Sequence, residues 1–348
     1  MKTPIVYVLI SSEQDYFLEE FWVSLFSLRQ FHPKDKVMVV TDEPTSHRID
    51  DRPGLKAMIS EVIIVPLPNE YNGRLRSRTL KTTIRNIIDG DFLTIDTDTV
   101  ICKPLDEVDS LPIKNIGMVP EMHGPFKNHI TYKFITNEIK RIYDTDVSDA
   151  PYWFNSGCML VRDNEFTREF FKKWNEEWKV ATFQKNASSD QRPLLKVDHD
   201  YGYVIECLPD TFNCQVALSI QYFHEAKILH FWHMKDDFFL DLSYSPFTSK
   251  YVYQQVKQNK SITPEVASLI KDCKNTFNSP SMVVGRNDLE FLLSPFNTIL
   301  GRAYRESKLM HCLIDKFMKL TYYYLRAKAK LGRLVRTKKP VSVLTGHK

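Results

Sequence analysis

Residues 89–99 read DGDFLTIDTDT, and the apolar run Phe92–Ile95 in this stretch ends directly at Asp96 and Asp98. Such a run, rich in aromatic and β-branched residues, predicts a buried strand. Side chains at i and i+2 of an extended segment leave the same face, so both carboxylates can approach one cation. The stretch therefore predicts a sheet strand whose carboxyl end holds Mg²⁺ or Mn²⁺. The alternative is a turn that only caps the strand.

The chain before this stretch alternates short apolar runs with helical patterns, which is typical of an α/β fold with parallel strands. Ligands of such sheets bind beyond the carboxyl ends of the strands, where Asp96 and Asp98 are expected. The expected strands are Ile5–Ile10, Val37–Thr41, Glu61–Val65 and Phe92–Ile95, and the expected helices are 16–31 and 74–88.

After residue 100 the pattern is less regular. We expect strands at 157–161, 203–207 and 228–232 and a helix at 165–178. We place a catalytic domain at residues 1–245 and a helical C-terminal extension at residues 246–348, basic from about residue 291. The predicted fold class is a Rossmann-like mixed sheet flanked by helices, followed by this extension.

Several short segments together resemble one enzyme family. They are YVLISSEQDY, RSRTLKT, IDTDTVI, WFNSGCMLV, the pair Asp190-Gln191 and KILHFWHMK. Over roughly residues 3–235 the chain resembles the retaining glycosyltransferases of family 8, which include glycogenin and bacterial lipooligosaccharide galactosyl- and glucosyltransferases. The resemblance implies a GT-A fold, a nucleotide-sugar donor, usually a UDP-sugar, and a divalent cation, typically Mn²⁺.

The resemblance also implies a role for individual residues. Asp96, Asp98 and His230 would bind the metal, and Asp190 and Gln191 would stand at the reacting centre. Donor contacts would come from Ser11, Ser12, Tyr16, Arg78, Lys81, Asp96, Thr97, Asn155 and Lys235. The last motif departs from the family pattern, because His233 replaces a glycine and Lys235 is one residue closer to His230.

Six of these residues also have a purely structural interpretation. The alternatives are a core aromatic for Tyr16, solvated helix positions for Arg78 and Lys81, a turn for Asn155, a helix N-cap for Asp190 and a core histidine for His230.

The net charge of +4 is the sum of two unlike parts. Residues 291–348 hold 13 Lys and Arg against 2 Asp and Glu, a net of +11, whereas the first 290 residues carry a net of −7. A basic helical segment with Leu, Met and Tyr predicts contact with an anionic membrane surface. No nucleic-acid partner is expected, because most of the chain is acidic.

Cysteine spacing and hydropathy bear on location. The six cysteines form no Cys-x-x-Cys pair, which suits a reducing cytoplasm. No signal peptide or membrane-spanning run is visible. We expect a cytoplasmic protein that is peripheral on the inner membrane face.

We therefore predict a metal-dependent, retaining glycosyltransferase. It would transfer a hexose from UDP-galactose or UDP-glucose to a glycan or glycolipid acceptor in cell-surface polysaccharide synthesis. One rival is a haloacid-dehalogenase-like phosphatase, with Asp96 as nucleophile and Asp98 as general acid. Another is a noncatalytic membrane or nucleic-acid binding protein that acts through the basic tail.

Overall fold

The computed structural model describes residues 1–232, 245–277, 290–292 and 294–336, with residues 329–336 described by their backbone. The chain divides into two compact units. The first comprises Met1–Asp236 and Asp241–Ser281, and the second comprises Asp237–Leu240 and Met282–Lys348.

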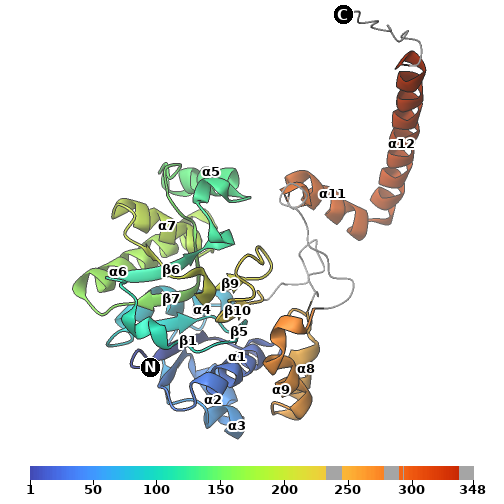
Figure 1. Cartoon of the computed structure of the whole chain (residues 1–348). Coiled ribbons are helices and arrows are strands. Elements are labelled where there is room, and N and C mark those ends of the chain that lie inside the picture. The colour runs from blue at the N-terminus through green and yellow to red at the C-terminus, as the bar shows by residue number, and fades with distance from the viewer. Residues whose placement is uncertain (233–244, 278–289, 293, 337–348) are drawn as a thin grey trace, which may run out of the picture. The chain divides into compact units, whose positions relative to one another are not determined.

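The first unit is built on a seven-stranded mixed sheet of order β3-β2-β1-β4-β7-β6-β8 (Figure 1). Strands β1 to β4 run parallel, and β7 runs antiparallel to both β4 and β6. The strands are β1 Ile5–Leu9, β2 Val37–Thr41, β3 Glu61–Ile64, β4 Phe92–Ile95, β6 Ile116–Pro120, β7 Phe154–Val161 and β8 Glu206–Cys207. The predicted fold class, a mixed sheet flanked by helices, is confirmed.

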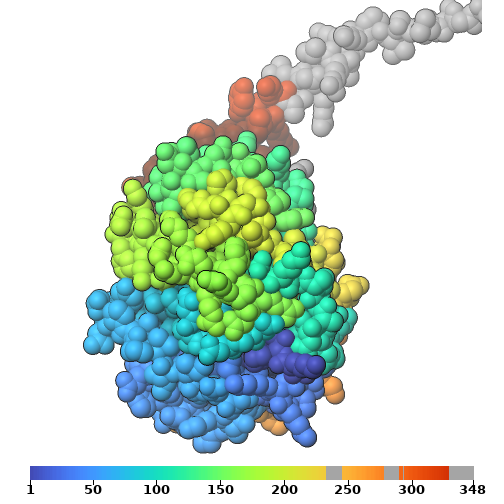
Figure 2. Space-filling view, turned by 90° about the vertical axis from the view of Figure 1, so that its left-hand side faces the viewer, coloured from blue at the N-terminus to red at the C-terminus, as the bar shows by residue number. Residues whose placement is uncertain are grey.

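Helices cover both faces of this sheet. Those of the first unit are α1 Phe17–Phe31, α2 Glu43–Asp50, α3 Pro53–Lys56, α4 Gly73–Thr83, α5 Tyr132–Tyr143, α6 Glu165–Lys179, α7 Gln191–Asp200, α8 Tyr251–Asn259 and α9 Pro264–Lys271. On one face α1, α8 and α9 share a core with β1, and on the other face lie α4, α6 and α7. Figure 2 shows the first unit from its side, with the N-terminal segments in blue and α5 to α7 in green.

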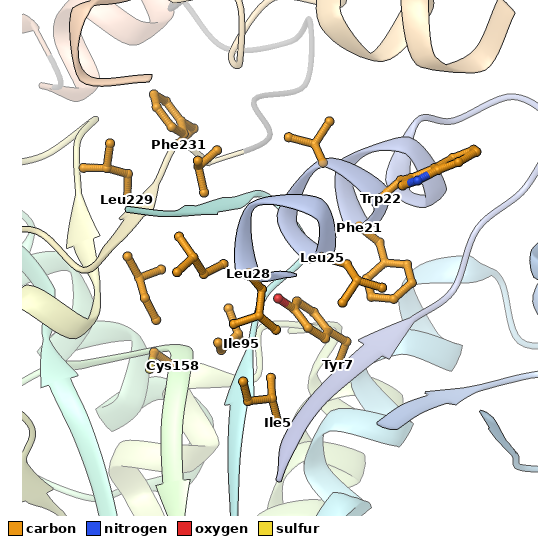
Figure 3. Packing of buried hydrophobic residues seen from close by; sticks show 14 of the residues in the cluster. Ile5, Tyr7, Phe21, Trp22, Leu25, Leu28, Ile95, Cys158, Leu229 and Phe231 are labelled. Carbon is orange, nitrogen blue, oxygen red and sulfur yellow. The ribbon is translucent and has the colours of Figure 1, made fainter. Parts of the chain in front are cut away.

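The alternation of side chains along β1 produces these two cores. Tyr7 points to one face, where its ring lies 5.0 Å from that of Phe21 in α1 (Figure 3). Val6 points to the other face and joins the cluster that contains Leu80 of α4 and Trp174 of α6. Successive side chains of a strand point to opposite faces of the sheet, and helices cover both faces here. Both sets of side chains are therefore buried, which explains why β1 is apolar throughout.

A second, three-stranded sheet follows the Asp-x-Asp motif. It consists of β5 Thr99–Ile101, β9 Cys214–Gln215 and β10 Ile228–His230. Strand β10 pairs antiparallel with β5, and His230 stands opposite Thr99. This pairing brings residues 98 and 230 together.

Four of the predicted strands are shorter in the structure. Those predicted at Ile5–Ile10 and Glu61–Val65 each end one residue earlier, and two others are shortened more. The segment expected at 203–207 is extended only over β8, and the one expected at 228–232 ends at His230. Tyr203 and Trp232 adopt positive φ angles of 61° and 56°, in the left-handed region that interrupts a strand.

The predicted domain boundary at residue 245 differs from the division near residue 281 in the structure. Helices α8 and α9 belong to the first unit, because their apolar side chains are buried in the core that contains α1. These side chains are Val252, Tyr253, Val256, Val266 and Ile270. The boundary predicted at residue 245 places both helices in the extension instead.

The second unit contains α11 Pro295–Glu306 and α12 Lys308–Arg336. Ser294 caps α11 by accepting a hydrogen bond from the Asn297 amide. Along α12 the apolar residues Leu309, Leu313, Phe317, Leu320 and Tyr324 recur every three or four positions and are all exposed. Among the described residues, no helix is sufficiently long and apolar to cross a bilayer.

Candidate active site

Asp96, Asp98 and His230 come together at the carboxyl end of β4. One ligand atom from each lies within 4.8 Å of the others. The Asp96 amide is anchored to the Gly157 carbonyl at 2.8 Å, and the Phe231 amide donates to the Asp98 carbonyl at 3.0 Å. The three predicted metal ligands are therefore held by the junction of the two sheets.

A chain of hydrogen bonds fixes which nitrogen of His230 carries a proton. The Gly157 amide donates to Asn155 Oδ1 at 2.9 Å, and the same oxygen accepts from Asn213 Nδ2 at 2.9 Å. The remaining amide oxygen of Asn213, Oδ1, lies 2.9 Å from His230 Nδ1. Since an amide oxygen only accepts, Nδ1 must donate, and Nε2 faces the Asp98 carboxylate at 3.1 Å.

This arrangement requires a proton or a metal cation between His230 Nε2 and the Asp98 carboxylate. A neutral imidazole with its proton on Nδ1 would direct a lone pair at a carboxylate oxygen, which also only accepts. Either a second proton on the ring or a cation satisfies both groups. Burial lowers the pKa of His230, but Asp98 and Asp96 outweigh burial and raise it. Two carboxylates and an imidazole nitrogen are a suitable donor set for Mn²⁺, so the residues fit the metal.

Gly157 is required by this geometry. A Cβ at this position would lie 2.5 Å from His230 Cε1 and 2.8 Å from Asn155 Oδ1. The glycine of the WFNSG motif thus makes room for the imidazole.

The predicted cationic residues of α4 lie beside two aspartates. Lys81 is buried and donates to both oxygens of Asp96, at 2.8 and 3.0 Å. Arg78 Nη1 donates to Asp190 Oδ2 at 3.3 Å, and the Ser156 hydroxyl donates to the same oxygen at 3.1 Å. Burial raises the pKa of Asp190, but Arg78 and Lys81 outweigh burial and lower it. Asp190 is therefore an ionised carboxylate at neutral pH.

Glu121 is a buried carboxylate that the sequence analysis did not identify. Its oxygens accept from Gln191 Nε2 at 2.8 Å and Asn155 Nδ2 at 3.1 Å, and His129 Nε2 lies 3.2 Å away. Burial raises the pKa of Glu121, but these partners, His129 first, outweigh burial and lower it. Glu121 thus joins Gln191 to the Asn155 network, although no motif in the sequence marks it.

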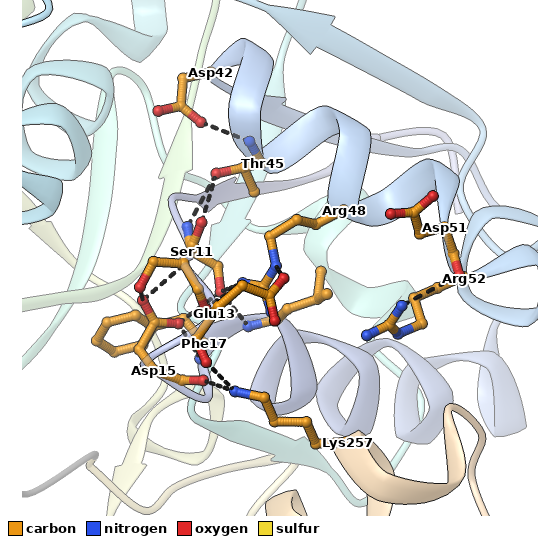
Figure 4. Close-up of polar contacts among 12 residues, drawn as sticks. Ser11, Glu13, Asp15, Phe17, Asp42, Thr45, Arg48, Asp51, Arg52 and Lys257 are labelled. Carbon is orange, nitrogen blue, oxygen red and sulfur yellow. Dashed lines mark hydrogen bonds and ion pairs between the residues drawn. The ribbon is translucent and has the colours of Figure 1, made fainter.

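The hydroxyl groups of Ser11 and Ser12 stabilise their own loop. Asp15 accepts hydrogen bonds from both hydroxyls, at 2.6 and 2.7 Å (Figure 4). Arg48 Nη1 donates to the Ser11 hydroxyl and to the Ser12 carbonyl. Tyr16 follows at the start of α1 and packs partly against the core. Contact of these three residues with a nucleoside stays a prediction.

The structure argues against three of the purely structural interpretations, those of Lys81, Asn155 and Asp190. Lys81 is buried rather than solvated, Asn155 lies within β7 rather than in a turn, and the Asp190 side chain makes no cap hydrogen bond to α7. Thr97, which stands between the two aspartates in the sequence, is half-buried. Lys235 lies outside the described residues.

No family model and no curated protein sequence matches this chain. Solved structures that it resembles include the apo form of mouse xyloside xylosyltransferase 1 (16% identity, 66% of this chain and 97% of that chain, TM-score 0.45). A second is the bifunctional glycosyltransferase WbbM, with 14% identity over 77% of this chain and 51% of that chain and a TM-score of 0.48. A third is the galactosyltransferase LgtC with donor and acceptor sugar analogues, with 13% identity over 76% of this chain and 99% of that chain and a TM-score of 0.48. Membership of family 8 remains a prediction from the motifs.

Proposed function

We propose that this protein is a metal-dependent glycosyltransferase with a GT-A fold that uses a nucleotide-sugar donor. The observation that carries the proposal is the convergence of Asp96, Asp98 and His230, whose ligand atoms lie within 4.8 Å of one another. Lys81 pairs with Asp96, and its charge, like that of Arg78, also lowers the pKa of Asp190, which pairs with Arg78. A divalent cation beside cationic side chains and a carboxylate suits the departure of a nucleoside diphosphate.

The residues of the site divide into three roles under this proposal. Asp96, Asp98 and His230 would hold Mn²⁺ or Mg²⁺, which when bound neutralises negative charge on the departing diphosphate. Arg78 offers a planar guanidinium for phosphate oxygens, and one well-placed group of this kind contributes on the order of 3 kcal/mol. Asp190 supplies the negative charge that a developing glycosyl cation requires.

We further propose that the transfer retains the configuration at the anomeric carbon, and we propose a donor and an acceptor. Retention requires either attack by a carboxylate or same-face attack by the acceptor, and Asp190 is the carboxylate we place at the reacting centre. We propose UDP-galactose or UDP-glucose as donor and a glycan or glycolipid as acceptor, in cell-surface polysaccharide synthesis. The resemblance of the motifs to family 8 supports these choices.

A thermal-shift panel of nucleoside diphosphates, with and without Mn²⁺, tests the proposal. We expect UDP with Mn²⁺ to raise the melting temperature of the wild type and to leave Asp98→Ala unchanged, since ligand that binds only the native state stabilises it. The metal-free samples are the control. A wild type that responds to no nucleotide would contradict the proposal.

We also propose that α12 binds an anionic membrane surface, which would place the enzyme on the cytoplasmic face. Five apolar residues recur along one side of α12 and are exposed: Leu309, Leu313, Phe317, Leu320 and Tyr324. At about 3.6 residues per turn, Lys308, Lys319 and Arg326 fall on the opposite side. An exposed apolar stripe with a basic back is typical of helices that lie in the membrane interface.

A further inference from the structure

Helix α8 reaches the loop at residues 11–16, although the two are far apart in the sequence. Lys257 of α8 donates from Nζ to the carbonyl oxygens of Glu13 and Asp15, at 2.6 and 2.9 Å. The same ammonium lies over the ring of Tyr16, 4.9 Å from its centroid. Figure 4 shows Lys257 approaching the loop from below α1. One lysine thus contacts three of the six residues of the loop.

A second cation holds the loop from the opposite side. Arg48 of α2 donates from Nη1 to the hydroxyl of Ser11 and to the carbonyl of Ser12, each at 2.5 Å. Its Nε lies 3.1 Å from a carboxylate oxygen of Glu13. The loop is therefore bound between a cation from α2 and a cation from α8, and each bond to a charged donor is stronger than a neutral one.

A buried carboxylate gives Lys257 a second electrostatic partner. Glu19, in the first turn of α1, is 1% exposed, and neither of its carboxylate oxygens has a hydrogen-bond partner. Burial raises the pKa of Glu19, whereas the charges of Lys257, Arg48 and Arg52 oppose this rise. Loss of the lysine charge would leave the buried carboxylate less compensated.

The backbone of Lys257 is held in place, because α8 is anchored in the core. Val252, Tyr253 and Val256, on the same helix, are buried in the cluster that contains α1. The ammonium therefore covers one face of the Tyr16 ring in the folded protein, and a planar base can stack only on the other face. An ammonium over one face of a ring also holds that ring in orientation.

We propose that Lys257 is a positioning residue that holds Tyr16 and residues 11–16 in the conformation that binds the nucleoside of the donor. This role rests on the proposed function, because it requires a nucleotide at the site. It assigns part of the donor site to a helix beyond the segment that resembles family 8.

The test compares Lys257→Met with Lys257→Arg and with Lys260→Met, a control on the exposed lysine that follows α8. The ligands are UDP and inorganic pyrophosphate, each titrated calorimetrically in Mn²⁺. We expect Lys257→Met to raise the dissociation constant for UDP about tenfold and to leave that for pyrophosphate, which has no nucleoside, unchanged. Lys257→Arg should recover most of the UDP affinity, and Lys260→Met should match the wild type.

Hydrogen exchange of the ligand-free protein gives a readout that does not depend on the donor. The amides of residues 11–17 should exchange faster in Lys257→Met than in Lys260→Met. If Lys257→Met does not fold, the double variant Glu19→Gln/Lys257→Met takes its place in both measurements. The glutamine removes the buried carboxylate charge that the lysine no longer compensates.

Two results would overturn the positioning role. One is UDP affinity and exchange in Lys257→Met equal to those in Lys260→Met. The other is an equal loss of UDP and pyrophosphate affinity, which would indicate general damage to the site. A wild type that binds neither ligand would instead overturn the proposed function, and hydrogen exchange would still decide whether Lys257 holds the loop.

Discussion

At the scale of single residues, the orientation of His230 depends on Asn213. The Asn213 amide accepts from His230 Nδ1 and donates to Asn155, so it fixes the tautomer that directs Nε2 at Asp98. Residues that orient a metal-binding histidine typically contribute about 10–100-fold to metal affinity. Asn213 therefore matters to the site without touching the proposed metal.

Asn213→Leu tests this dependence. We expect the affinity for Mn²⁺, measured by electron paramagnetic resonance titration, to fall by about 10–100-fold, because the imidazole loses its acceptor. Asn259→Leu, on the exposed side of α8, is the control and should bind Mn²⁺ as the wild type does. Equal Mn²⁺ affinity in the two variants would contradict the proposed arrangement.

Gly157→Ala tests the close approach of β7 to His230. The added methyl group would lie 2.5 Å from His230 Cε1, so the imidazole must move. We expect the free energy of unfolding in urea to fall by roughly 1–3 kcal/mol, the usual cost of overpacking a core. In Gly73→Ala the nearest atom is 3.8 Å away, and this control should lose little stability. If Gly157→Ala has the stability and the Mn²⁺ affinity of the wild type, the imidazole is not closely packed against β7 and the prediction is wrong.

The sequence could identify some residues of the site and not others. Asp96 and Asp98 could be predicted, because two carboxylates directly after a buried strand are a local pattern. Glu121 and Asn213 could not, because each depends on partners distant in the sequence, such as Gln191 and His230. Only the resemblance to a family marked His230, since its pairing with β5 joins segments about 130 residues apart.

At the scale of elements, helices α8 and α9 are part of the first unit. Their apolar side chains complete the core on the face of the sheet that α1 covers. The strands of the first 100 residues could be located from the regular alternation of apolar runs and helical patterns in the sequence. The unit to which α8 and α9 belong could not be predicted, because a short amphipathic helix does not indicate which surface buries its apolar face.

Two truncations test the assignment of α8 and α9. A chain that ends at residue 245 loses the five buried apolar side chains of α8 and α9, together with buried Phe247 and Cys273. Full burial of a large apolar side chain contributes about 1.5–3 kcal/mol. The total for these side chains is comparable to the stability of a whole domain, roughly 5–15 kcal/mol, so we expect no cooperative thermal transition by circular dichroism. A chain that ends at residue 281 should retain the transition. Cooperative melting of the chain that ends at residue 245 would show that the first unit folds without α8 and α9, as the predicted domain boundary requires.

At the scale of the whole molecule, charge and exposed apolar surface are concentrated in one part of the chain. Residues 291–348 carry a net charge of +11 and the rest carries −7. Near an anionic membrane surface, each cation contributes about 1 kcal/mol, and the exposed stripe of α12 adds apolar contact. A tail of this kind would bring an enzyme to a lipid-linked acceptor.

Co-sedimentation with vesicles tests the membrane role. We expect the full chain to sediment with vesicles rich in phosphatidylserine, and the chain without residues 291–348 to remain in the supernatant while it still binds UDP. Leu313→Asp/Leu320→Asp should weaken binding strongly, because charges in the apolar stripe oppose insertion. Unchanged sedimentation of the truncated chain would refute the role, and tight RNA or DNA binding at about 200 mM salt would favour a nucleic-acid partner.

We propose that Asp96, Asp98 and His230 bind a metal that assists cleavage of a nucleotide sugar. The most direct measurement is release of UDP from UDP-galactose and UDP-glucose in Mn²⁺, for the wild type and Asp98→Asn. We predict release by the wild type that stops on addition of a chelator, and a loss of at least about 100-fold in the variant. Equal release by the two proteins would contradict the account, as would phosphate release from a generic phosphoester in Mg²⁺ without any cleavage of a nucleotide sugar.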